Sequence, residues 1–187
     1  MNSLRVAREF NPEQSWFEEV KDIAQSSLKD YGPLEFSDRP TLTVMGKDEF
    51  ERCARTNDLD AKAIDSIAED LGYNLVRYAS PSVELAADSL YVRKNSKTNH
   101  DRSQLAVKFY GDDNLINDRN IVTSTIDAAT NRVNDWPPDY VFNLQIGRIN
   151  RRVEMTDLRR INRRIGGLAL PKTKAVFGQI VIESIKY

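Results

Sequence analysis

The sequence predicts an α+β fold. Segments with the alternating pattern of strands and segments with the 3.6-residue spacing of helices are interspersed along all 187 residues. Each half of the chain places a helix, a short strand with a polar face and another helix in succession, and this mixture favours α+β. The composition, 40% hydrophobic and 29% charged, is typical of a globular protein. We expect one domain over residues 1–187, built as two small lobes folded as one unit.

The first half of the chain opens with a strand and a helix. Residues 4–10 alternate apolar and charged side chains, as in a half-buried strand. Asn11-Pro12-Glu13-Gln14 has the cap and first-turn residues of a helix start, and the helical spacing then runs from Trp16 to Leu28, before Gly32-Pro33. The elements expected next are a strand at 41–45, a short helix at 47–55, a helix at 60–71 that Gly72 ends, and strands at 75–78 and 83–92.

The second half repeats this mixture of elements. A polar loop at 95–101 and a strand at 105–110 lead into a turn at 111–114, and Asp118 is the candidate cap for a helix at 120–133. A strand at 141–148 follows Trp136-Pro137-Pro138-Asp139, because the prolines break any helix there. The last expected elements are a helix at 157–165 capped by Thr156-Asp157 and stopped by Gly166-Gly167, and a closing strand at 175–185.

Two of these strands carry a related polar triplet. In Val141–Arg148, Asn143 and Gln145 share one face with Gly147, because side chains alternate along a strand. About a hundred residues earlier, Thr41-Leu42-Thr43 again places two polar side chains around an apolar one on a strand that runs into Gly46. We expect the two triplets to face a shared groove.

The paired triplets resemble the signature of the two-histidine phosphoesterases, the family that includes the bacterial 2'-5' RNA ligases. Each half of those proteins carries a strand reading His-x-Thr or His-x-Ser, and the second copy often continues into Gly-Arg. Here Thr41 stands at the first histidine position, Asn143 at the second, and Gln145 at a Thr position, while Ile146-Gly147-Arg148 is kept. The resemblance implies two antiparallel lobes with flanking helices around a central cleft, an internal pseudo-duplication.

The missing histidines argue against the family's chemistry. That chemistry needs one imidazole to take a proton and another to give one, and histidine does both near neutral pH. Threonine, asparagine and glutamine cannot titrate there, so we expect no catalytic residue in the cleft. Hydroxyls, carboxamides and a guanidinium can still hold phosphate oxygens. The residues expected to bind a nucleotide, a cyclic nucleotide or an RNA end are Thr41, Thr43, Asn143, Gln145 and Arg148; equally, they could simply satisfy one another or water.

An arginine-rich segment is the second functional candidate. From Arg148 onward the chain has ten Lys and Arg against three acids, so this part carries +7, and residues 1–147 carry −8. At about 100° per residue, the arginines of the helix at 157–165 lie opposite Leu158, Ile161 and Ile165. Such a face can bind nucleic-acid phosphates, or meet a protein partner or another copy of the chain. The arginines concerned are Arg151, Arg152, Arg159, Arg160, Arg163 and Arg164.

The remaining features narrow the function classes. One cysteine, Cys53, and one histidine, His100 in the polar loop, are too few for a zinc site, and we expect no metal and no cofactor. No apolar run approaches the ~20 residues of a membrane span, and the first residues lack the pattern of a secretory signal. We therefore expect a reduced, cytoplasmic protein. Three classes stay open: a silent phosphoesterase-like binder, an enzyme with unrecognised chemistry, and an interaction protein.

Overall fold

The computed structural model describes residues 3–94 and 103–185, so the sequence prediction of a loop at 95–101, with His100, lies outside the described residues. The strands are β1 (Ser3–Phe10), β2 (Leu34–Phe36), β3 (Thr41–Met45), β4 (Val83–Leu85), β5 (Ala87–Lys94), β6 (Ser103–Phe109), β7 (Phe142–Ile149) and β8 (Ala175–Ile185). The helices are α1 (Ser15–Leu28), α2 (Lys47–Thr56), α3 (Ala61–Tyr78), α4 (Asp113–Thr130) and α5 (Met155–Ile165), with a short 3-10 turn at Lys29–Tyr31.

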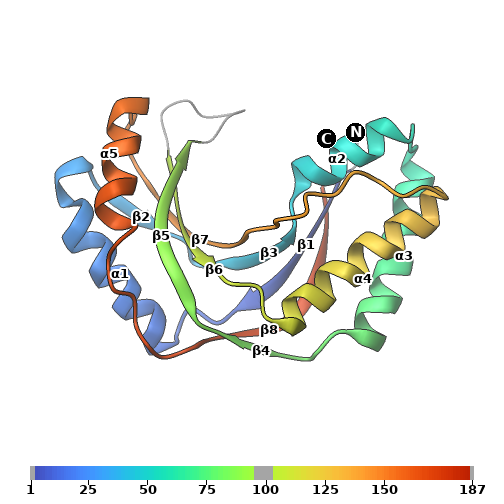
Figure 1. The fold of residues 1–187 in the computed structure, drawn as a ribbon, viewed down its shortest axis with the longest axis horizontal. Helices are drawn as coiled ribbons and strands as arrows, with labels where there is room; N and C mark the ends of the chain where they lie inside the picture. The colour runs from blue at the N-terminus through green and yellow to red at the C-terminus, as the bar shows by residue number, and fades with distance from the viewer. Residues whose placement is uncertain (1–2, 95–102, 186–187) are drawn as a thin grey trace.

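The described strands form one antiparallel sheet that curls into a half-barrel, and the fold is α+β as predicted. The strand order is β4-β8-β1-β3-β7-β6-β5, and β2 pairs with β7 beside the end of β3. The strands of the two halves thus join in a single sheet, with the two triplet strands next to each other at its centre. Helices α1 and α5 lie at one end of the curl and α2, α3 and α4 at the other, which gives the molecule two lobes (Figure 1).

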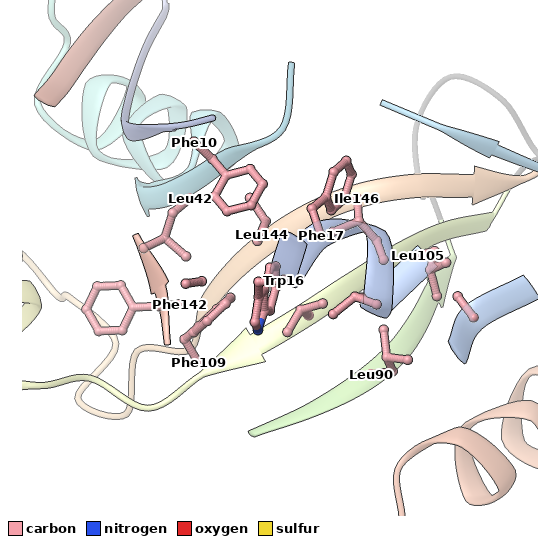
Figure 2. Packing of buried hydrophobic residues seen from close by; sticks show 14 of the residues in the cluster. Phe10, Trp16, Phe17, Leu42, Leu90, Leu105, Phe109, Phe142, Leu144 and Ile146 are labelled. Atoms are coloured by element: carbon pink, nitrogen blue, oxygen red, sulfur yellow. The ribbon is translucent and has the colours of Figure 1, made fainter. Parts of the chain in front are cut away.

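The core lies between the sheet and these helices, in two apolar clusters. One cluster joins the sheet to α1 and α5, and Figure 2 shows Leu42 and Leu144 in it, close to Trp16 and Phe10. The second cluster joins Leu4 and other residues of the sheet to α2, α3 and α4. Burial of these side chains supplies most of the driving force for the fold. No helix of the described residues is long and apolar enough to cross a membrane.

The structure corrects two predictions about α3 and the region after it. The helix runs through Gly72 to Tyr78, so the predicted strand at 75–78 is wrong. A glycine inside a helix costs only about 1 kcal/mol, and buried Leu71 and Leu75 continue the apolar stripe across it. The single strand predicted at 83–92 is two strands, because β4 pairs with β8 whereas β5 pairs with β6.

Helix α4 also begins earlier than predicted. The cap is Asp112, whose side chain accepts a hydrogen bond from the backbone N–H of Leu115 at 2.9 Å, so the helix starts within the predicted turn at 111–114. Asp118 is therefore not a cap but a fully buried residue inside the helix. Val133, the last residue of the predicted helix, lies beyond the end of α4 and is exposed.

Strand β2 has no counterpart in the sequence prediction, although one signal for it exists. A Cβ atom added to Gly147 would overlap the backbone carbonyl oxygen of Glu35 and lie 3.1 Å from the Cα of Phe36. A glycine inside a strand often marks such a close backbone approach. Gly147 therefore lets β2 pair with the end of β7, where Glu35 lies opposite Arg148.

Candidate functional site: a cationic cleft around the two triplets

The two triplets meet on neighbouring strands. Leu42 of β3 pairs with Leu144 of β7, and Thr43 pairs with Asn143, which brings Thr41 opposite Gln145 in this antiparallel register. The first residue of each triplet thus faces the last residue of the other, as local two-fold symmetry requires. Because both leucines are fully buried in the core, the four polar side chains emerge together on the other face of the sheet.

These four side chains line one cleft of about 630 Å³, a volume in the range of small-molecule sites. The described residues around them include six basic and two acidic side chains, so the lining carries a net positive charge. A concave surface lined by one sign of charge concentrates ligands of the opposite sign. The basic residues are Arg5, Arg39, Lys47, Arg52, Arg93 and Lys94, and the acids are Asp48 and Glu49.

Arg5 of β1 is the basic residue most closely joined to the triplets. Its Nη2 donates to Thr41 Oγ1 at 2.7 Å and to Thr43 Oγ1 at 3.0 Å, while Nη1 donates to Glu183 Oε2 at 3.0 Å. A guanidinium therefore lies against both threonines of the first triplet. The sequence analysis did not find this residue, because only the pairing of β1 with β3 brings it to the triplets.

Asn143 and Gln145 offer further polar atoms to the cleft. Asn143 Nδ2 donates to the backbone oxygen of Val141 at 3.0 Å, while its Oδ1 atom is buried and has no hydrogen-bond partner among the described residues. Leaving a buried acceptor unpaired costs about 1–3 kcal/mol, so a donor at this position would be stabilising. Both side chains are half-buried and lie on the floor of the cleft.

Arg148, the fifth residue predicted to bind ligand, is placed differently. Its Nε donates to Glu35 Oε2 at 2.8 Å, and its Nη2 atom contacts Glu35 Oε1 as well. It does not belong to the described lining of the cleft. The pairing of β2 with β7 explains this, since it brings a carboxylate directly opposite the guanidinium. The structure thus brings four of the five predicted residues together and leaves Arg148 outside.

One wall of the cleft is held by a buried pair beneath Tyr140. Arg119 of α4 donates through Nη1 to Glu49 Oε2 and to the backbone oxygen of Val44, both at 3.0 Å. Its guanidinium carbon lies 3.9 Å from the centre of the Tyr140 ring, a cation–π distance. Burial, and then the negative charge of Glu49, raise the pKa of the Tyr140 phenol. The cluster thereby fixes α2 and the segment before β7 at the edge of the cleft.

Because of this pKa shift, the free energy of unfolding changes with pH in the alkaline range. Below about pH 10, the ordinary pKa of tyrosine, Tyr140 is neutral in the folded and in the unfolded protein, and its contribution to stability is fully present. Above pH 10 the unfolded chain loses the proton first, so the free energy of unfolding falls, by at most about 1.4 kcal/mol per pH unit. Urea unfolding from pH 9 to 11 should show a steeper fall for the wild type than for Tyr140→Phe. Equal slopes would contradict this.

None of the six arginines predicted to bind nucleic acid lines the cleft, and the four on α5 lie across the sheet from the triplets. Ile161 and Ile165 of α5 are buried in the same apolar cluster as Leu42 and Leu144. The polar side chains next to these leucines point to the other face of the sheet, into the cleft. Arg151, Arg152, Arg159, Arg160, Arg163 and Arg164 are all exposed. The arginine helix and the cleft are therefore two separate surfaces.

A second hollow adjoins the cleft. It measures about 770 Å³ and shares Arg5, Arg39 and Thr41 with it. Its lining includes Glu9, Asp38 and Glu183, so it suits an anion less well than the smaller cleft does. Among the described residues, no group of three or more His, Cys, Asp or Glu side chains could hold a metal ion.

Comparison with known proteins identifies the fold. The sequence matches no protein-family model and no curated protein. The structure resembles that of Usb1 from Kluyveromyces marxianus, with a TM-score of 0.60 and 8% identity over 98% of this chain and 96% of that one. It also resembles E. coli LigT complexed with 3'-AMP, with a TM-score of 0.54 and 12% identity over 100% and 89% of the two chains.

A third solved structure, described as a phosphoesterase, has a TM-score of 0.51 and 11% identity, over 98% of this chain and 88% of that one. At such low identity these likenesses concern the fold, and they match the resemblance that the two triplets predicted. The chain has the fold of the two-histidine phosphoesterase superfamily.

Proposed function

We propose that this protein binds a nucleotide, a cyclic nucleotide or an RNA end in the cleft and does not hydrolyse it. The main support is the combination found at the cleft floor: two triplets with no group that titrates near neutral pH, the first of which is hydrogen-bonded to the cation Arg5. Hydroxyls, carboxamides and a guanidinium bind phosphate oxygens. Proton transfer from the attacking hydroxyl and to the leaving oxygen has no suitable side chain in either triplet.

The likeness to LigT, whose structure was determined with 3'-AMP, suggests the first ligand to test. Calorimetric titration with 3'-AMP and with 2',3'-cyclic AMP should show binding in low salt. Incubation with 2',3'-cyclic AMP should give no more product than the buffer does. Clear turnover by the wild-type protein would refute the silent-enzyme proposal, and the absence of binding by every nucleotide tested would refute the ligand class.

Replacing Arg5 by methionine tests the role of the central cation. Arg5→Met keeps most of the apolar stem and removes the charge that we expect to contact phosphate. Hydrogen bonds to charged groups are worth about 1.5–3 kcal/mol, so the affinity for 3'-AMP should fall by about 10- to 100-fold. Arg77→Met is the matched control, since Arg77 is on α3 and stacks on Tyr73 and Tyr78 outside the cleft. An unchanged affinity in Arg5→Met would place the phosphate elsewhere.

A further inference from the structure

The arginine face of α5, formed by Arg159, Arg160, Arg163 and Arg164, is a basic surface outside the cleft. Six exposed arginines lie within residues 151–164, and three ion pairs offset part of their charge. Arg152 pairs with Glu154 at 2.9 Å, Arg164 with Asp30 at 3.6 Å and Arg160 with Asp157 at 3.9 Å. These pairs are solvent-exposed, so each is worth about 0–1 kcal/mol and a phosphate can compete for the arginine.

Arg159 and Arg163 form no ion pair with any described residue. They are four residues apart, so they lie on the same side of α5 about 6 Å apart along its axis. The opposite side of the helix holds Ile161 and Ile165, which are fully buried and fix its orientation. The exposed side therefore presents at least two arginines, one helical turn apart, that form no ion pair with the described residues.

The edge strand β5 connects this face to the cleft. The Asn162 side chain accepts from the backbone N–H of Val92 at 2.7 Å and donates to its carbonyl oxygen at 2.8 Å, which fastens α5 to the strand. The next two residues, Arg93 and Lys94, are exposed and line the cleft. Figure 1 shows α5 alongside β5. Basic side chains thus stand on both sides of the same strand edge.

We propose that single-stranded RNA is held at two places, with its end in the cleft and its following nucleotides crossing the end of β5 onto the arginine face of α5. This rests on the proposed function for the cleft, and it adds a second surface that recognises only the phosphate backbone. The described part of α5 has no aromatic side chain, so binding there is electrostatic rather than by base stacking. A mononucleotide occupies the cleft alone, whereas a longer strand also contacts Arg159 and Arg163.

The test compares two probes on the same variants. One is 3'-AMP, which reports on the cleft; the other is a fluorescein-labelled 20-nucleotide RNA of mixed sequence, titrated from 0.05 to 0.4 M salt. The variant is Arg159→Gln with Arg163→Gln, which keeps two good helix formers on an exposed face. Arg55→Gln with Lys62→Gln is the control, because it removes the same charge from exposed positions of α2 and α3.

For a single strand, each phosphate contact contributes about 0.7 to the slope of log affinity against log salt concentration. One contact therefore raises the RNA affinity about fivefold at 0.1 M salt relative to 1 M salt. The Arg159/Arg163 double variant should therefore bind the RNA about 25-fold more weakly at 0.1 M, with a slope reduced by about 1.4. Its 3'-AMP affinity should not change, and the control should bind both probes like the wild type. An unchanged RNA affinity and slope, or an equal loss in the control, would overturn the two-place arrangement. If the wild type does not bind 3'-AMP at all, the proposed function of the cleft is wrong, whatever the RNA titrations show.

Discussion

Restoring the two histidine triplets is expected to produce cyclic phosphodiesterase activity. The variant combines Thr41→His, Asn143→His and Gln145→Thr, and Thr43 is already in place. Because the register pairs position 43 with 143 and position 41 with 145, each new histidine stands opposite a threonine of the other triplet. Each proton transfer by a positioned side chain is typically worth about 10²- to 10⁴-fold in rate. We expect at least a hundredfold increase in 2',3'-cyclic AMP hydrolysis over the wild type.

The pH profile and two single-histidine variants make this result interpretable. Activity should follow a bell-shaped curve, because one imidazole must be neutral and the other protonated. Variants with one histidine should be slower than the triple variant at every pH. Histidine NMR signals that shift on addition of 3'-AMP would establish that both rings are in the cleft. If both histidine signals shift and the triple variant still hydrolyses 2',3'-cyclic AMP no faster than the single-histidine variants, the family alignment of the triplets is wrong.

Removing Asp118 is expected to have the largest effect on stability. Its carboxylate accepts from Arg8 Nε at 2.6 Å and from Arg8 Nη2 at 2.9 Å, and both side chains are fully buried. Arg8 also donates to the backbone oxygens of Gly178 and Ser80, both at 2.8 Å. Asp118→Ala leaves a buried cation without its counter-ion, so the free energy of unfolding should fall by about 3–5 kcal/mol. Urea unfolding at pH 7 measures this directly.

A double-mutant cycle separates the ion pair from its neighbours. Arg8→Met combined with Asp118→Ala removes both charges together, so its cost should be smaller than the sum of the two single losses. A loss below about 1 kcal/mol in Asp118→Ala would contradict the assignment of this pair as the link between α4 and β1. Nucleotide affinity of the folded fraction should not change, because neither residue lines the cleft.

The triplets were predictable because alternation along a strand is a local property. Leu42 and Leu144 had to face the core once their strands formed, so their polar neighbours had to share the other face. Arg8 shows the limit of this reasoning: the pattern of residues 4–10 groups it with Arg5 as a charged side chain, yet it is completely buried. Its burial depends on Asp118, 110 residues away in the chain. Arg5 likewise became part of the site only through pairing with β3.

The amino-acid sequence by itself determined the α+β class, most of the element order and the two polar triplets, because the spacing of apolar residues along the chain dictates which side chains are buried. Tertiary structure decided which strands are neighbours. It joined the two halves into one sheet, divided residues 83–92 between two partners and paired Arg148 with Glu35 outside the cleft. The local apolar pattern fixes which face of a strand is buried, whereas the choice of its neighbour depends on backbone hydrogen bonds and packing between segments that are distant in the chain.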